Sequence, residues 1–258
     1  MSDYQFIIYE VKEGAAYLTI NRPPLNWLDV ATMKEMNQAL DEVLVAGPEV
    51  KLLVIQAAGE KAFSVGVDVA DHTEDKVESM IEVFHGIFRR LDKLEIPSLA
   101  AVKGAVLGGG CEVALFCDLV LAAENIKIGQ PEIKLAVFPP VAAAALPAIV
   151  GPKKAYEIVL GGEAVRASEA LAIGLVNKVV PVDQFADELA NFVKRFTSLS
   201  GAALRSSKRA LKAGVGKSFA AALGEIEKLY LEDCMKNADA HEGLASFLEK
   251  RAPVWRNK

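Results

Sequence analysis

Two glutamates stand in surroundings that would suit acid–base chemistry. Glu112 ends the run Gly104-Ala-Val-Leu-Gly-Gly-Gly-Cys-Glu, and Glu132 ends the run Ile128-Gly-Gln-Pro-Glu. If the chain folds back between them, the two carboxyl groups can hold one water molecule from two sides and move protons at a double bond. Taken singly, each glutamate is equally well explained as a carboxylate at the start of a helix, where the helix dipole favours negative charge.

Two glycine-containing loops could supply backbone donors beside such a pair. Gly108 to Gly110 precede a predicted helix, so their N–H groups could hold a phosphate or an oxyanion. The spacing matches neither of the common nucleotide-binding glycine motifs, and the glycines could instead allow a helix to pack closely on a strand. In Ala62-Phe-Ser-Val-Gly-Val-Asp, Gly66 permits unusual backbone angles that could turn the Val67 N–H into a site. A buried turn with no role in binding or catalysis could have the same sequence.

The elements needed to position these groups alternate between strands and helices, which indicates an α/β fold. Strands are expected at 6–9, 15–20, 51–57, from 99, and at 119–123. Helices are expected at 29–45, 75–93, from about 112, at 141–149 and at 152–160. Four more helices follow, at 183–198, 201–213, 218–236 and 239–250. The sequence therefore predicts an α/β core over 1–195 and a C-terminal helical region over 196–258.

Composition narrows the class of protein. The chain has 258 residues, of which 52% are hydrophobic, so we expect a sizeable core and buried subunit interfaces. A net charge of −5 argues against nucleic acid as a partner. The three cysteines and three histidines lack the spacing of a disulfide framework or a metal site, so no metal is predicted.

No membrane or export segment is expected. The N-terminus has neither a basic segment nor a long apolar one. The most apolar stretch, Leu135 to Val150, contains Pro139, Pro140 and Pro147, which favour a turn and a short buried helix over a membrane span. A cytoplasmic location is the expectation.

Taken in order, several segments resemble the crotonase (enoyl-CoA hydratase/isomerase) superfamily almost from end to end. These segments are NRPPLNWLD, KAFSVGVDV, AVKGAVLGGGCEVAL, CDLVLA, IGQPEIKLAV, EAVRASEALAIGLVNKVV and EGLASFLEKR. The resemblance implies a crotonase-like spiral of ββα units with a C-terminal helical trimerisation region. It also implies a homotrimer or a dimer of trimers. The substrate would be an acyl-CoA thioester, and no separate cofactor is needed because coenzyme A is part of that substrate.

The resemblance also implies roles for individual residues. The N–H groups of Val67 and Gly109 would form an oxyanion hole for the thioester carbonyl. Glu112 and Glu132 would activate water and handle the proton at Cα. Coenzyme A would lie against residues of two loops, with help from a neighbouring subunit: Arg22, Pro24, Leu25, Ser64, Val65, Gly66 and Asp68.

One segment departs from the usual hydratase pattern. After Glu132 the family is commonly glycine-rich, whereas this chain has Pro139-Pro-Val-Ala-Ala-Ala-Ala. Three segments resemble cyclic dienoyl-CoA hydratases, which hydrate cyclohexa-1,5-diene-1-carbonyl-CoA in anaerobic aromatic degradation: this one, the stretch Asp71-His-Thr-Glu-Asp-Lys and the ending LYLEDCMKNADAHEGLASFLEKR. The alternatives are a straight-chain enoyl-CoA hydratase, an enoyl-CoA isomerase, and a non-catalytic acyl-CoA-binding protein. Because both glutamates are present, hydration is expected.

Overall fold

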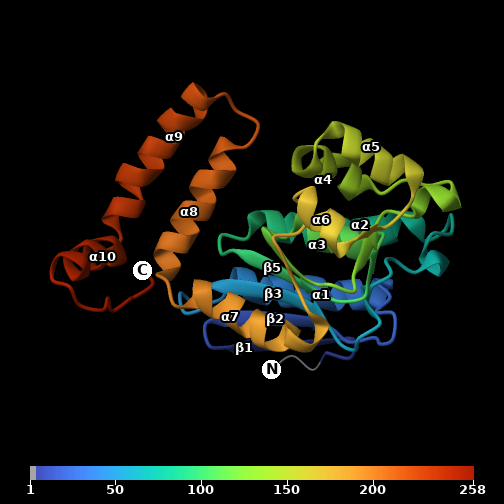
Figure 1. Ribbon diagram of the computed structural model, residues 1–258, viewed down its shortest axis with the longest axis horizontal. Coiled ribbons are helices and arrows are strands. Elements are labelled where there is room, and N and C mark those ends of the chain that lie inside the picture. The colour runs from blue at the N-terminus through green and yellow to red at the C-terminus, as the bar shows by residue number, and fades with distance from the viewer. Residues whose placement is uncertain (1–3) are drawn as a thin grey trace.

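The protein is described by a computed structural model that covers residues 4–258; residues 1–3 of the predicted core lie outside the described part (Figure 1). Its larger sheet has six strands in the order β1-β2-β3-β5-β7-β10. Their bounds are β1 Ile7–Lys12, β2 Ala15–Ile20, β3 Leu52–Ala57, β5 Ser98–Val102, β7 Leu119–Ala123 and β10 Lys178–Val180. Strands β1 and β2 form an antiparallel hairpin, and the other neighbouring strands are parallel.

A smaller sheet lies beside the larger one and has four strands in the order β4-β6-β8-β9. Their bounds are β4 Ala62–Ser64, β6 Ala105–Leu107, β8 Lys127–Gly129 and β9 Val165–Arg166. The chain repeatedly runs through a strand of the large sheet, a strand of the small sheet and then a helix, as in β3-β4-α2, β5-β6-α3 and β7-β8-α4. This repetition confirms the predicted α/β spiral of ββα units.

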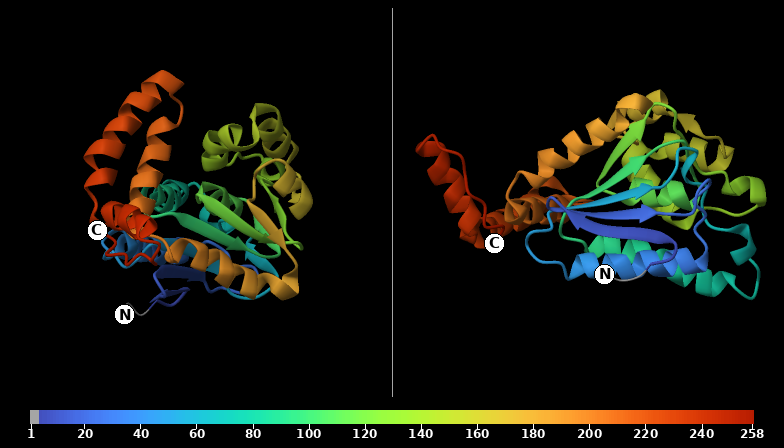
Figure 2. Two further views of the ribbon diagram at one scale, coloured as in Figure 1. Left: turned by 60° about the vertical axis from the view of Figure 1, so that its left-hand side comes forward. Right: turned by 90° about the horizontal axis from the view of Figure 1, so that it is seen from below.

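The described residues contain ten α-helices, of which the last three project away from the sheets (Figures 1 and 2). They are α1 Val30–Leu44, α2 Val77–Lys93, α3 Gly109–Phe116, α4 Pro140–Val150, α5 Pro152–Gly161, α6 Ala167–Ala172, α7 Phe185–Thr197, α8 Gly201–Gly214, α9 Phe219–Glu232 and α10 Ala238–Leu248. Four short 3-10 turns complete the set: η1 Val69–Asp71, η2 Glu132–Leu135, η3 Val182–Gln184 and η4 Cys234–Lys236. No helix among residues 4–258 has the length and apolar character to cross a membrane.

Both faces of the large sheet are covered, which explains why the first four residues of β3, Leu52 to Ile55, are apolar. Successive side chains of a strand point to opposite faces. Leu53 and Ile55 therefore join the main core, which also contains side chains of α1 and α2. Leu52 and Val54 join a second cluster with Phe185 of α7. The sheet is thus a fixed platform for the loops at its strand ends.

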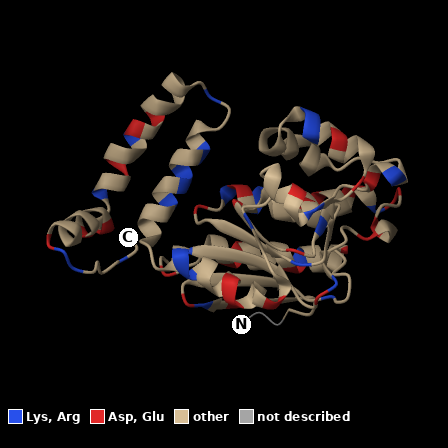
Figure 3. Cartoon of the chain, in the orientation of Figure 1, with Lys and Arg blue, Asp and Glu red and all other residues tan. Residues whose placement is uncertain are grey.

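The last three helices extend away from the core (Figures 1 and 2). α8 is joined to the core by the buried Lys208, whose Nζ donates to Asp118 Oδ2 at 2.7 Å and to the Ile96 carbonyl at 2.9 Å. The charged residues of α8 are basic, and those of α9 are mostly acidic (Figure 3). The predicted helix over 218–236 ends earlier, at Glu232, where η4 follows. The predicted boundary at 195/196 falls inside the last turn of α7, and this division stays a prediction.

Candidate active site

The glycine turn between β6 and α3 begins the site. α3 starts at Gly109, three residues before the expected position near Glu112, because Gly108 serves as its N-cap with φ of 54° and ψ of −129°. This backbone conformation is strained for residues with a Cβ atom, so glycine is needed there. The Gly108 N–H donates to the Gly129 carbonyl at 3.0 Å. The turn is therefore fastened to the end of β8, three residues before Glu132.

The loop after β4 lies directly against this turn. Gly66 has φ of 103°, and a Cβ atom placed on it would stand 3.1 Å from the Gly109 nitrogen. The fully buried Ser64 accepts a hydrogen bond of 3.1 Å from the Gly66 N–H through its hydroxyl. Ser64 thus fixes the turn that brings Gly66 to Gly109.

Val67 is paired with Leu28 in an isolated parallel bridge. The Leu28 N–H donates to the Gly66 carbonyl at 3.0 Å, and the Asp68 N–H donates to the Leu28 carbonyl at 3.4 Å. Because this pairing uses the groups on either side of Val67, the Val67 N–H points away from Leu28. A Cβ atom on Gly109 would stand 3.0 Å from Val67 Cγ2, so the two predicted oxyanion-hole residues are neighbours.

Glu112 is nearly inaccessible, with 2% of its surface exposed. Its Oε1 atom accepts a hydrogen bond of 2.8 Å from the Ala142 N–H at the start of α4. Burial raises the pKa of Glu112 to about 7; the nearby Glu132 carboxylate adds to the rise, while the N–H groups of Ala142 and Val141 oppose it. Glu112 can therefore take up or release a proton near neutral pH.

Glu132 is the first residue of η2 and is partly buried. Its Oε1 atom stands 2.8 Å from the position that a Cβ atom on Gly108 would take. Burial also raises the pKa of Glu132 to about 7. The structure thus brings the second predicted carboxyl group to the glycine turn, within electrostatic reach of Glu112.

Sequence reasoning missed Gln130, which is fully buried beside Glu132. With its amide nitrogen turned toward the carboxylate, Gln130 donates to the two oxygens of Glu132 at 3.0 and 3.1 Å. A signal was present in the sequence, since a polar residue directly after a predicted buried segment, and two positions before Glu132, needs a hydrogen-bond partner. Gln130 is placed to orient Glu132.

The predicted coenzyme A residues form two adjoining segments. The Val65 N–H donates to the Leu25 carbonyl at 3.1 Å, which joins the loop after β4 to the segment that contains Pro24. Arg22 is turned toward α1: its guanidinium pairs with Asp29 and lies over the Phe6 ring, 4.9 Å from the ring centre. The Arg22 charge is thus already partnered in this structure.

Two further polar groups shape these segments. Asp68 accepts a hydrogen bond of 3.0 Å from the Ala70 N–H and caps η1. Asn26, which sequence reasoning missed, is fully buried with φ of 52° and donates to the Ala58 and Ala62 carbonyls at 2.9 and 2.8 Å. It also accepts a bond of 2.9 Å from the Arg22 N–H. Asparagine tolerates this left-handed conformation better than most residues, and its presence between two predicted elements was the signal in the sequence for a structural role of Asn26.

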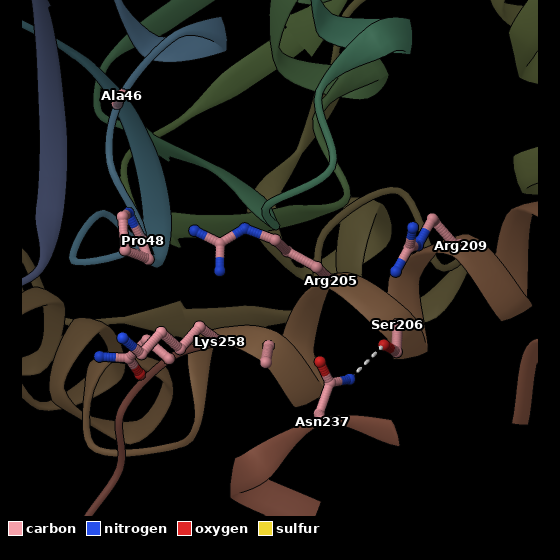
Figure 4. A pocket seen from close by; sticks show the side chains of 9 residues that line it. Ala46, Pro48, Arg205, Ser206, Arg209, Asn237 and Lys258 are labelled. Carbon is pink, nitrogen blue, oxygen red and sulfur yellow. Dashed lines mark hydrogen bonds between the residues drawn. The ribbon is translucent and has the colours of Figure 1, made fainter. Parts of the chain in front are cut away.

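A separate cavity of about 310 Å³ lies where the C-terminal region meets the core, and Figure 4 shows its lining. Arg205 and Arg209 of α8 line it, yet each already has a partner: Arg205 donates to the Val50 carbonyl at 3.1 Å, and Arg209 pairs with Asp233. None of the predicted site residues lines this cavity. It is distinct from the glutamate pair.

Known proteins resemble this chain in sequence and in structure. A family model described as enoyl-CoA hydratase/isomerase matches residues 10–258. The cyclohexa-1,5-dienecarbonyl-CoA hydratase of Thauera aromatica is 38% identical over 241 residues, covering 93% of this chain and 92% of that protein. The crotonyl-CoA hydratase of Syntrophomonas wolfei is 37% identical over 253 residues, covering 96% of each chain. A crystal structure of an enoyl-CoA hydratase from Bacillus anthracis superposes with a TM-score of 0.93 at 28% identity, covering 98% of this chain and 100% of that one.

Proposed function

This chain belongs to the enoyl-CoA hydratase/isomerase family, as the sequence motifs predicted, and from that premise we propose that it adds water across a conjugated double bond of an acyl-CoA thioester. Several of its relatives are named hydratases, which places the chain among hydro-lyases. The observation that carries the proposal is the pair of carboxyl groups at one glycine turn, that of the buried Glu112 and that of the partly buried Glu132.

The two loops would supply an oxyanion hole. The N–H groups of Val67 and Gly109 belong to neighbouring residues, and the Val67 N–H is not used in pairing with Leu28. When water adds to the double bond, negative charge develops on the thioester oxygen, and fixed donors stabilise that charge. Each such donor is worth about 3 to 4 kcal/mol in other enzymes with oxyanion holes.

The two glutamates would share the proton transfers. One carboxylate removes a proton from water as its oxygen bonds to the β-carbon, and the other carboxylic acid gives a proton to the α-carbon. This division requires one ionised and one protonated group, and two carboxyl groups with pKa values of about 7 meet that requirement near neutral pH. The pair returns to its starting state when one proton passes from one carboxyl group to the other. No electrons are transferred in these steps, so no redox partner takes part.

For the acyl group, we propose cyclohexa-1,5-diene-1-carbonyl-CoA, in anaerobic aromatic degradation. The support is the 38% identity to the hydratase of that substrate and the Pro139–Ala145 segment. This segment begins α4, whose Ala142 contacts Glu112 directly, so it would form the wall beside the reacting carbon. A straight-chain enoyl-CoA is the second candidate, because the crotonyl-CoA hydratase of Syntrophomonas wolfei is 37% identical.

The decisive experiment supplies the purified enzyme with crotonyl-CoA and with the cyclic dienoyl-CoA, and follows the loss of the conjugated enoyl absorbance. A kcat/KM at least tenfold higher for the cyclic substrate supports the proposal, and the reverse preference favours the straight-chain candidate. Reactions in ¹⁸O-labelled water separate hydration from isomerisation, because only hydration puts solvent oxygen into the product. Tight acyl-CoA binding in calorimetry without turnover would instead indicate a non-catalytic binding protein.

We further propose a cytoplasmic homotrimer or dimer of trimers that binds no nucleic acid and needs no cofactor beyond the coenzyme A of its substrate. The support for an assembly of subunits is the projecting C-terminal region, where Phe219 and Phe247 are 81% and 82% exposed. Large apolar side chains in such a position favour burial between subunits. Analytical ultracentrifugation measures the assembly, and a monomer at micromolar concentration would exclude it.

A further inference from the structure

Gly109 is a glycine for reasons of space and not of backbone conformation. It is the first residue of α3 and its φ is not positive, so other residues could adopt the same backbone. A Cβ atom placed on Gly109, however, would stand 2.9 Å from Phe84 Cζ and 3.0 Å from Val67 Cγ2. The Phe84 ring and the Val67 methyl group therefore occupy the volume that a side chain at position 109 would take.

The position of the Phe84 ring is fixed by a row of aromatic side chains. Phe84 is buried in α2, and its ring packs edge-on against Phe88 of the same helix, with 4.9 Å between the ring centres. Phe88 packs in the same way against Phe116, the last residue of α3, at 5.3 Å. Such edge-to-face pairs are favourable arrangements of aromatic rings. The row therefore contacts α3 at its first residue, Gly109, and at its last.

The backbone of Gly109 also meets the loop after β4. A Cβ atom on Gly66 would stand 3.1 Å from the Gly109 nitrogen. That loop is held in place by the bridge between Val67 and Leu28. Gly109 is thus packed against a fixed loop and against the Phe84 ring. Because protein interiors are close-packed, a loss of the ring would let Gly109 move relative to Val67.

We propose that Phe84 is a positioning residue for the oxyanion hole: its ring fills the space beside Gly109 and keeps the N–H groups of Gly109 and Val67 at the separation that binds one thioester oxygen. This role rests on the oxyanion hole of the function proposed above. The Phe84 side chain has no polar group, so it acts through the position of its neighbours. Position matters because donors of an oxyanion hole act at about 2.7 to 3.1 Å from the oxygen.

The test compares Phe84→Leu with Phe116→Leu. Each variant removes one ring of the same row, but Phe116 lies at the end of α3 that is remote from Gly109. The probe is butanoyl-CoA with ¹³C at the thioester carbonyl, which has no double bond to hydrate, and infrared difference spectroscopy follows its carbonyl stretch. Hydrogen bonds to the oxygen lower this frequency on binding. Phe84→Leu should lose about half or more of the lowering found in the wild type, because a displaced donor bonds more weakly. Phe116→Leu should retain it.

A double variant and steady-state kinetics add two further readouts. Gly109→Ala places a Cβ atom against Phe84 Cζ and should abolish the carbonyl shift. Combining it with Phe84→Leu, which has no Cζ atom, should restore part of the shift, a coupling that independent sites would not show. In Phe84→Leu alone, kcat for enoyl-CoA hydration should fall by about 10-fold or more with little change in KM, because the hole binds charge that develops in the transition state.

Equal carbonyl shifts in Phe84→Leu and Phe116→Leu would overturn the proposal. A wild-type protein that fails to bind the probe, or binds it without a shift, would do the same. If circular dichroism shows that Phe84→Leu does not fold, Phe84→Met fills more of the space and repeats the comparison. A shift that depends on Phe84, in a protein that hydrates no enoyl-CoA, would refute the proposed function and leave the role of Phe84 intact. Hydration together with a shift that is independent of Phe84 would do the reverse.

Discussion

The carboxylate of Glu132 occupies the space that Gly108 leaves by having no side chain: Glu132 Oε1 lies 2.8 Å from the point at which a Cβ atom on Gly108 would stand. Gly108 also precedes α3, the helix that carries Glu112. One glycine therefore sets the approach of one glutamate and the starting point of the helix that presents the other. This relationship makes the turn between β6 and α3 the most sensitive part of the candidate site.

Replacing Gly108 by alanine should abolish most of the activity. The added Cβ atom would displace Glu132, and the φ of 54° would strain the backbone. We expect kcat for enoyl-CoA hydration to fall by about 100-fold or more, in line with the loss of a general acid–base group. Gly161→Ala is the matched control, because a Cβ atom there meets nothing within 4 Å. Equal activity in both variants would contradict the close fit of Glu132 and Gly108.

Glu112→Gln and Glu132→Gln should each lower kcat by about 10² to 10⁴-fold, the range for general acid–base groups. Glutamine has nearly the shape of glutamate, so in Glu112→Gln the amide oxygen of the new side chain can still accept the Ala142 N–H, and the fold should persist. Steady-state hydration assays measure the rates, and circular dichroism checks the fold. Wild-type rates in either variant would remove that residue from the proposed mechanism.

The pH dependence of stability should report the buried Glu112. Its pKa rises from 4.5 in the unfolded chain to about 7 in the folded protein, so the folded state binds more protons between these values. The contribution of the protonated Glu112 to the free energy of unfolding is therefore complete below about pH 4.5. It is lost as the pH rises through about 7, and the loss amounts to up to roughly 3 kcal/mol. Glu112→Gln has no such group, so its free energy of unfolding should exceed that of the wild type at pH 8 more than at pH 5.

Urea unfolding at fixed protein concentration measures this difference, since subunit association also affects apparent stability. The matched control is Glu163→Gln, a change to an exposed carboxylate that pairs with Lys134 at the surface. It should show no comparable difference between the two pH values. A Glu112→Gln variant that follows the wild-type pH dependence would show that burial does not disfavour the Glu112 charge.

Asn26→Ala should weaken both the fold and substrate binding. The change leaves the Ala58 and Ala62 carbonyls without their donor and places alanine at a φ of 52°. Each buried group left unsatisfied costs about 1 to 3 kcal/mol. We expect a lower melting temperature and a KM for acyl-CoA raised several-fold, because Asn26 holds the segment from Arg22 to Leu25. An unchanged KM would separate this segment from coenzyme A binding.

Much of the fold could be predicted from local patterns. A helix was expected over 29–45, and its first residue, Asp29, accepts the Thr32 N–H at 2.8 Å as the N-cap of α1. The apolar run over 51–57 became β3, and the helical spacing over 75–93 became α2. These outcomes follow from neighbouring residues, because capping, strand alternation and helical periodicity act over a few positions. The start of α3 was misplaced because Gly109 and Gly110, poor helix formers, were assigned to the loop.

The sequence by itself determined the family, the two candidate carboxyl groups and the glycines that could accompany them, since these depend on residue types in a fixed order. Tertiary structure decided what no local pattern contains. It placed Glu132 against Gly108, joined Glu112 to the first turn of α4, and buried Gln130 and Asn26 beside the groups they hold. The physical reason is that the pKa of a carboxyl group depends on burial and hydrogen bonds from distant segments, and these exist only once the chain has folded.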